Sequence, residues 1–259
     1  LAGVRILFIS DATTSLQGYE AGEINVTSIL PGSEIPRLLA EDPNFSSEPA
    51  LGCAYLQFNM DADVVNDLNV RKALALAIDR SMITDQVLRD GAVPAAAFVA
   101  PTFKLSTGES MRPLDENGNV VEEYEIDPYS AKVEEAQEYL AAAGYPNGEG
   151  FPETTYLYNT DDKHQAVAEA LQQMWSNVLG VDVTLNNQDW NVFLETRSAG
   201  DYSICRNGWI ADYNDPVSFL DMFMTDNGNN DAHYSNPEYD AMMTTVLSDS
   251  DAAGRMELM

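Results

Sequence analysis

Short apolar or alternating runs recur between longer amphipathic stretches of the chain, and this order predicts strands that alternate with helices. Strands are expected at residues 4–9, 24–29, 51–59, 154–158, 181–185 and 201–207. Apolar positions three or four residues apart predict helices at 13–22, 31–39 (a helix or a capped turn), 70–78, 79–88, 131–143, 163–179, 190–199 and 237–247. Hairpin signals are scarce, so the pattern favours an α/β fold with a mostly parallel sheet. The expected helix caps include Asn69, Asp79, Ser130 and Asp189.

The stretch from 201 to 221 combines a strand, a polar loop and a helix start. Gly208 is expected to interrupt the strand, residues 209–214 to form a loop, and Asp215-Pro216 to begin a helix. Open α/β sheets place ligands where a strand ends before a helix. Asp212 lies there between Ala211 and Tyr213, a setting that suits a cation such as an amine. An ordinary loop, whose aspartates cap helices and bind water, explains the same spacing equally well.

Three phrases of the sequence resemble one known family. GWIADYNDP at 208–216, VRKALALAIDR at 70–80 and YLAAAGYPNGEGFP at 139–152 are similar to signatures of the extracellular oligopeptide- and dipeptide-binding proteins of ABC importers. The resemblance implies a type II periplasmic-binding-protein-like lobe, with a mostly parallel mixed sheet flanked by helices. Members of that family carry further chain on both sides of this region. Residues 1–259 are therefore expected to form one ligand-binding lobe, without the first lobe and the C-terminal tail.

The same resemblance assigns the ligand contacts. Asp212 would hold the α-amino group of a short peptide, the two tryptophans would wall side-chain pockets, and basic residues would meet a carboxylate. The residues that it places at the ligand are Tyr55, Asn159, His164, Trp190, Arg197, Arg206, Trp209, Asp212, Tyr213 and Asn214. Simpler interpretations stay open for several of them: core packing for Trp190, a half-buried strand position for Tyr55, a solvated helix for His164 and an aspartate partner for Arg206.

Charge limits the partners further. The chain has 42 acidic and 13 basic residues and a formal net charge of −29, which argues against nucleic acid and anionic membrane surfaces. Solubility is the simplest explanation for this acidity. No apolar run reaches the roughly 18 residues of a membrane span. The resemblance implies an extracellular or periplasmic protein, anchored as a lipoprotein at full length, that delivers its ligand to a membrane permease.

Other functions receive less support. A hydrolase could pair Asp212 with Asp215, or His164 with an aspartate, yet the sequence has no G-x-S-x-G, no HExxH and no Cys/His cluster at metal spacing. No metal or cofactor is expected. Relatives of this kind also bind nickel complexes, haem or oligosaccharides, so a non-peptide solute stays open. Cys53 and Cys205 fall on predicted strands, where unpaired buried cysteines are the more common case.

Overall fold

A four-stranded mixed sheet forms the centre of the molecule. The computed structural model describes residues 3–27, 30–47, 50–105, 107–249 and 251–259. The strands are β1 (Gly52–Phe58), β2 (Thr154–Asn159), β3 (Val183–Gln188) and β4 (Ile204–Ile210), in the order β1-β4-β2-β3. β2 runs parallel to both β3 and β4, whereas β1 is antiparallel to β4. The predicted α/β fold with a mostly parallel mixed sheet is confirmed.

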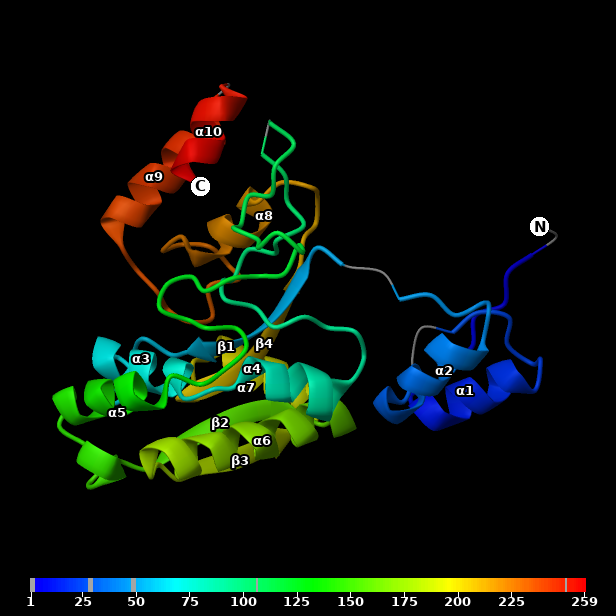
Figure 1. Cartoon of the computed structure of the whole chain (residues 1–259), viewed down its shortest axis with the longest axis horizontal. Helices are drawn as coiled ribbons and strands as arrows, with labels where there is room; N and C mark the ends of the chain where they lie inside the picture. Colours follow the sequence, from blue (N-terminus) through cyan, green and yellow to red (C-terminus); the bar gives the residue numbers. More distant parts are fainter. Residues whose placement is uncertain (1–2, 28–29, 48–49, 106, 250) are drawn as a thin grey trace.

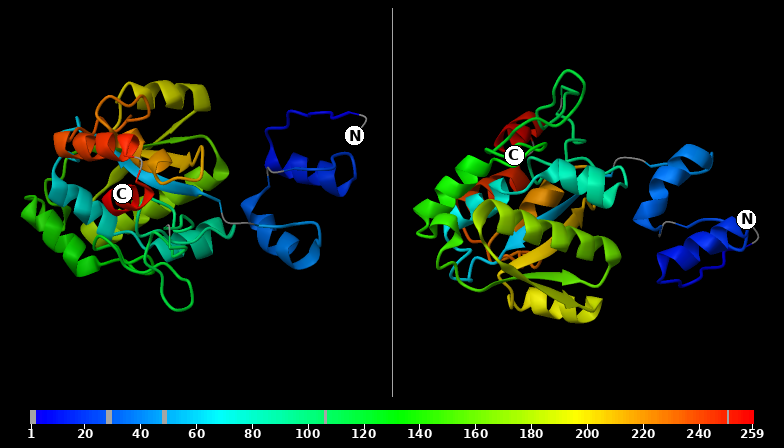
Figure 2. Two further views of the ribbon diagram at one scale, coloured as in Figure 1. Left: turned by 90° about the horizontal axis from the view of Figure 1, so that it is seen from above. Right: turned by 60° about the horizontal axis from the view of Figure 1, so that its bottom comes forward.

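Helices cover both faces of this sheet. α3 (Leu68–Leu76), α5 (Val133–Ala142) and α6 (Asp162–Leu179) pack with Tyr156 and Ile204 in the main core. α7 (Trp190–Ser198) packs with Leu157 and Cys205 on the other face, and the right-hand view of Figure 2 shows the strands between α6 and α7. Adjacent strand residues point to opposite faces, so the alternating runs feed both cores. Trp175 of α6 is fully buried and donates from Nε1 to the Leu74 carbonyl at 2.9 Å.

The β1–β4 pair extends beyond the rest of the sheet. β2 pairs with β4 only at Tyr156–Ile204 and Leu157–Cys205, whereas β1 pairs with β4 along its whole length. The two-stranded extension supports a second group of elements around Phe103 and Phe219 (Figure 1). These elements are the loop at 91–127, α8 (Val217–Leu220), η4 (Asp221–Phe223), α9 (Pro237–Ser248) and α10 (Ala252–Leu258).

In the described residues before β1, helices form as predicted but the two predicted strands do not. α1 (Ala12–Glu20), η1 (Gly32–Glu34) and α2 (Ile35–Glu41) lie to one side of the sheet (Figure 1). The strand predicted at 4–9 is wrong: Val4, Ile6 and Phe8 are 79%, 72% and 98% exposed in extended chain. Residues 24–27 are also not a strand, and 28–29 lie outside the described residues. A strand needs a neighbour for its backbone groups, and the described residues supply none here.

Helix ends follow local capping chemistry with small shifts from the predictions. Asp67, rather than Asn69, caps α3 by accepting from the Asn69 backbone N–H at 2.7 Å. Asp79 caps α4 (Arg80–Met82), as predicted, and a π-helical segment, η2 (Ile83–Leu88), follows directly. α5 begins after Lys132 without a side-chain cap, so the prediction for Ser130 is wrong. Asp189 precedes α7 but makes no capping hydrogen bond. A short η3 (Pro146–Gly148) leads into β2.

The two cysteines are free thiols. Gln57 pairs with Cys205 and Cys53 pairs with Trp209, so the cysteines lie four positions out of register on neighbouring strands. That offset is about 13 Å along the strand, well beyond the reach of a disulfide. The strand register therefore excludes a disulfide between them.

Candidate functional site

β4 continues through the point where the sequence predicted a break. Gly208 pairs with Ala54 and Trp209 with Cys53, so both residues belong to the strand, and the loop begins at Ala211. The expectation that Gly208 ends the strand is therefore wrong. The antiparallel ladder of β1 supplies backbone partners at this position, which a reading of the local sequence does not detect.

Asp212 lies in the loop just after β4, with its side chain exposed to solvent. Its backbone N–H donates to the hydroxyl of buried Ser218 at 2.9 Å, which fixes the loop against α8. Among the described residues, nothing forms a hydrogen bond or an ion pair with the Asp212 carboxylate. Asp215, three residues on, differs: it accepts from Arg255 at 3.0 and 3.1 Å and from the Val217 N–H at 2.9 Å. Asp212 is thus free to meet a ligand.

The surroundings of Asp212 are anionic. Burial raises the pKa of Asp221, and the charge of Asp212 raises it further. Burial also raises the pKa of Tyr213, followed by the charges of Asp221, Asp215 and Asp212. Burial is the largest cause of both shifts, and the neighbouring carboxylates add a negative electrostatic field to it. The same field attracts a cation, and Tyr213 and Asn214 are exposed beside it.

Arg206 lies on β4 six residues before Asp212, on the face that α6 covers. Its half-buried guanidinium has no hydrogen-bond or ion-pair partner in the described parts of the chain, and burial lowers its pKa. His164, in the first turn of α6, has its pKa lowered by burial and then by the positive charge of Arg206. Asn159, the last residue of β2, is buried, and its Oδ1 has no hydrogen-bond partner among the residues that the structure describes. Arg206 is the third residue of β4 and lies level with the end of β2. Asn159, His164 and Arg206 are therefore near the carboxyl end of β2, whereas Asp212 follows the carboxyl end of β4.

Arg197 has a different environment from Arg206. Its Nε lies 2.7 Å from Asp231 Oδ2, an ion pair whose side chains are 17% and 11% exposed. Its Nη1 donates to Asn207 Oδ1 at 3.0 Å, and the guanidinium lies 5.4 Å from the Phe193 ring. The positive charge of Arg197 is therefore neutralised within the chain, on the α7 face of the sheet. Arg197 and Arg206 lie on opposite faces of the sheet, although the charge of Arg197 contributes to the lowered pKa of Arg206.

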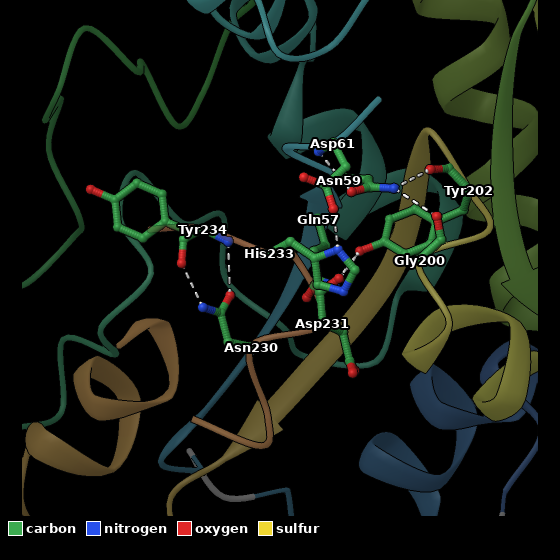
Figure 3. Close-up of polar contacts among 9 residues, drawn as sticks. All are labelled: Gln57, Asn59, Asp61, Gly200, Tyr202, Asn230, Asp231, His233 and Tyr234. Carbon is green, nitrogen blue, oxygen red and sulfur yellow. Dashed lines mark hydrogen bonds and ion pairs between the residues drawn. The ribbon is translucent and has the colours of Figure 1, made fainter. Parts of the chain in front are cut away.

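A network of polar contacts holds Asp231 in this position (Figure 3). Tyr202 donates its hydroxyl hydrogen to the Asp231 carbonyl at 2.6 Å and accepts from Gln57 Nε2 at 2.6 Å. Asn59 Nδ2 donates to the carbonyls of Gly200 and Tyr202 at 2.7 and 3.0 Å. The network joins the end of β1, the turn before β4 and the loop that precedes α9. It makes Arg197 part of a structural support.

Three of the aromatic residues that were predicted to contact ligand, Trp209, Tyr55 and Trp190, differ in their surroundings. Trp209 is half-buried in the cluster of Phe103 and Phe219, with Nε1 3.4 Å from Ser218 Oγ. Tyr55 packs edge-on against Phe98 at 4.6 Å, and its buried hydroxyl lacks a hydrogen-bond partner within the described part of the chain.

Trp190 has a different environment from Trp209 and Tyr55. It is 51% exposed at the start of α7 and stacks on Phe193 at 5.7 Å, so it is not a core residue. As ligand contacts, all three aromatic side chains stay predictions.

The sequence did not predict three residues that shape the loop around Asp212. Ser218 fixes its backbone, Asp221 adds negative charge beside it, and Arg255 neutralises Asp215. The helix start at Asp215-Pro216 predicts that Ser218 lies in the following helix, so the sequence could have indicated that Ser218 is close to the loop. Arg255 lies 40 residues from Asp215 in sequence, so no local sequence pattern predicts their contact.

The described residues contain no group of three or more His, Cys, Asp or Glu side chains arranged to hold a metal ion. They also contain no helix that combines the length and the apolar character of a membrane span.

The mixed four-stranded sheet flanked by helices is the fold of the type II periplasmic binding proteins. The sequence matches the profile of the bacterial extracellular solute-binding proteins, family 5 Middle, over residues 1–231. The chain belongs to this family of substrate-binding proteins.

Comparison with individual relatives supports the same family assignment. The periplasmic oligopeptide-binding protein OppA of Salmonella typhimurium is 36% identical over 261 residues, which cover 98% of this chain and 45% of the relative. The oligopeptide-binding protein OppA of Bacillus subtilis is 34% identical over 268 residues, covering 100% and 46%. The crystal structure of Haemophilus influenzae OppA in complex with RPPGFSPFR superposes with a TM-score of 0.82 at 32% identity, covering 97% and 48%. The chain thus spans about half the length of these relatives.

Proposed function

We propose that this chain is one ligand-binding lobe of an extracellular or periplasmic receptor that delivers short peptides to an ABC importer. The family membership and the peptide bound to the Haemophilus influenzae relative support this proposal. The observation that carries it is the exposed, unpaired carboxylate of Asp212 at the end of β4, beside two further carboxylates. That carboxylate would accept charge-assisted hydrogen bonds from the α-ammonium group of the peptide, each about 1.5–3 kcal/mol in a closed site.

The other end of the peptide has a candidate partner in Arg206. A half-buried guanidinium without a partner gains from a carboxylate, and a bound carboxylate would also raise the pKa of nearby His164 back toward its ordinary value. Arg206 and Asp212 are six positions apart, which is at most about 20 Å of extended chain. An extended peptide of up to about six residues fits between its two charged ends at that separation.

The rest of the receptor would lie in chain outside these residues. The exposed apolar side chains of Val4, Ile6 and Phe8 are the kind of surface that another part of the protein covers. A lipoprotein anchor, a membrane permease as partner and a purely non-enzymatic role belong to the same proposal. They rest on the family and on its relatives alone.

Calorimetry of the intact receptor tests the proposal. Tri- to pentapeptides with free ends should bind, and N-acetylation of the same peptides should weaken binding strongly, because it removes the cation that Asp212 meets. A solute without an amine, such as haem or an oligosaccharide, that bound in place of peptides would overturn it.

A further inference from the structure

A surface hollow of about 230 Å³ opens between α3 and the turn at residues 123–126. Its lining is mostly apolar and consists of Phe58, Arg71, Lys72, Ala75, Leu76, Tyr124, Glu125 and Ile126. Phe58 pairs with Ile204 at one end of the β1–β4 ladder, and Ile210 forms the other end, next to Asp212. Six strand residues separate the two ends, about 20 Å. The hollow is therefore remote from Asp212, and Arg206, the proposed carboxylate partner, does not line it.

The turn beside the hollow has an unfavourable backbone. Tyr124 and Glu125 both have left-handed φ values, 51° and 68°, between the bridged residues Glu123 and Ile126. Glycine or asparagine adopts this conformation with less strain. The Glu125 carboxylate has a structural use, because it accepts from Lys72 Nζ at 2.9 Å and so ties the turn to α3.

The side chain of Tyr124 contacts the fold through Arg112 and is otherwise directed to solvent. It is 74% exposed, and its ring lies 5.2 Å from the Arg112 guanidinium. Arg112 is itself held by an ion pair with Glu123, whose side chain is 15% exposed. A largely solvated tyrosine is thus kept in a strained conformation at the edge of an apolar hollow. Tyrosine and arginine are the residue types that anchor protein interfaces.

The charge at the hollow is opposite to that of the chain as a whole. Two cations, Arg71 and Lys72, and one carboxylate, Glu125, line it, whereas the whole chain carries 13 basic and 42 acidic residues. Arg71 donates from Nη1 to the carbonyls of Val65 and Asn66 at 3.0 and 2.7 Å. Its Nε and Nη2 have no acceptor in the part of the chain that the structure describes. These donors favour an anionic group at the rim.

We propose that this hollow is a docking site for a protein partner that inserts one large apolar side chain flanked by a carboxylate. The apolar side chain fills the floor formed by Phe58, Leu76 and Ile126 and packs against the Tyr124 ring. The carboxylate accepts hydrogen bonds from Arg71. A second copy of this strongly acidic chain is disfavoured by charge repulsion. This interaction lies beyond peptide binding.

The test uses the intact protein and a fluorescent peptide with both ends blocked, Ac-Asp-Leu-Phe-Glu-NH2, which lacks the α-ammonium that the peptide site requires. Fluorescence anisotropy should show saturable binding that Tyr124→Asn and Arg71→Met each weaken by about tenfold or more. Tyr124→Asn should at the same time raise the urea midpoint of unfolding, because asparagine relieves the strained turn. Tyr129→Asn, at another exposed tyrosine, is the matched control and should leave binding unchanged.

Two results would overturn the proposal. The first is equal binding of the charge-reversed probe Ac-Lys-Leu-Phe-Lys-NH2, or full binding by Tyr124→Asn, since either would mean nonspecific adhesion. The second is protection of Tyr124 from nitration in the intact protein without any partner, because the receptor itself would then cover the hollow. Ready nitration of Tyr124, suppressed by the acidic probe, supports the proposal.

Discussion

Arg255 donates two hydrogen bonds to the carboxylate of Asp215, at 3.0 and 3.1 Å, and so ties the C-terminal helix α10 to the loop that carries Asp212. Arg255 also donates from Nε to the Val246 carbonyl at 2.9 Å. The contact neutralises one carboxylate of the loop and leaves the Asp212 carboxylate free. The geometry of the proposed amine site therefore depends on a residue far from it in sequence.

Replacement of Arg255 by methionine should lower the free energy of unfolding by about 1.5–3 kcal/mol, because the partly buried Asp215 loses its cation. Urea unfolding followed by circular dichroism measures this. Arg37→Met is the control: Arg37 pairs with Glu20 and Glu34 at the surface, where such pairs contribute roughly 0–1 kcal/mol. Equal losses in the two variants would contradict a special role for the Arg255–Asp215 contact.

The core depends on Trp175. Trp175→Ala should cost about 3–5 kcal/mol, because it leaves a cavity between α3 and α6. Trp175→Phe should cost less, about 1–3 kcal/mol, mainly because the buried Leu74 carbonyl loses its donor. Trp190→Phe, at an exposed position, should change the unfolding free energy by less than about 0.5 kcal/mol. A Trp175→Phe variant as stable as the parent would contradict the importance of that hydrogen bond.

His164 makes stability depend on pH. Its pKa is lowered in the folded chain from an ordinary value of 6.5, so the unfolded chain binds the proton more readily. Stability should therefore be unaffected by His164 above the ordinary pKa, and should fall as pH drops from there to the lowered pKa. His164→Gln should flatten this part of the profile when unfolding is measured from pH 7.5 to 5. An unchanged slope in the variant would assign the effect to other groups.

The sequence predicted the helices and the inner strands well because their signals are local. The apolar periodicity of α6, its cap Asp161 and the left-handed Gly180 at its end all lie within 20 residues of one another. The signature around Asp212 likewise placed the candidate amine contact correctly in a loop after a strand. Capping and periodicity need no knowledge of distant residues.

Pairing over long distances explains most of the errors. The segment at 4–9 has the apolar character of a strand, yet whether it becomes one depends on a neighbouring strand. β4 continues through Gly208 because β1, about 150 residues earlier in the chain, pairs with it. The sequence also could not separate Arg197 from Arg206. Arg197 pairs with Asp231 on the α7 face, whereas Arg206, on the α6 face, has no such partner in the described ranges of the chain.

Arg206 should favour ligand binding at the expense of stability. Arg206→Met should stabilise the ligand-free chain by about 0.5–2 kcal/mol, because it removes a half-buried charge without a partner. In the intact protein, the same change should weaken binding of a peptide with a free carboxyl end and leave its amidated form nearly unaffected. Calorimetry with both forms separates the two effects. Equal weakening of both peptides would show that Arg206 acts on the fold and not on the carboxylate.

The most direct measurement is a double-mutant cycle between Asp212 and the α-amine of a peptide. Affinities of the free and N-acetylated forms of one tetrapeptide are measured by calorimetry for the intact protein and for its Asp212→Asn variant. The account predicts that Asp212→Asn weakens the free peptide about 10- to 100-fold more than the acetylated one, the equivalent of a charge-assisted contact. An equal effect on both peptides would contradict the assignment of Asp212 as the amine-binding residue.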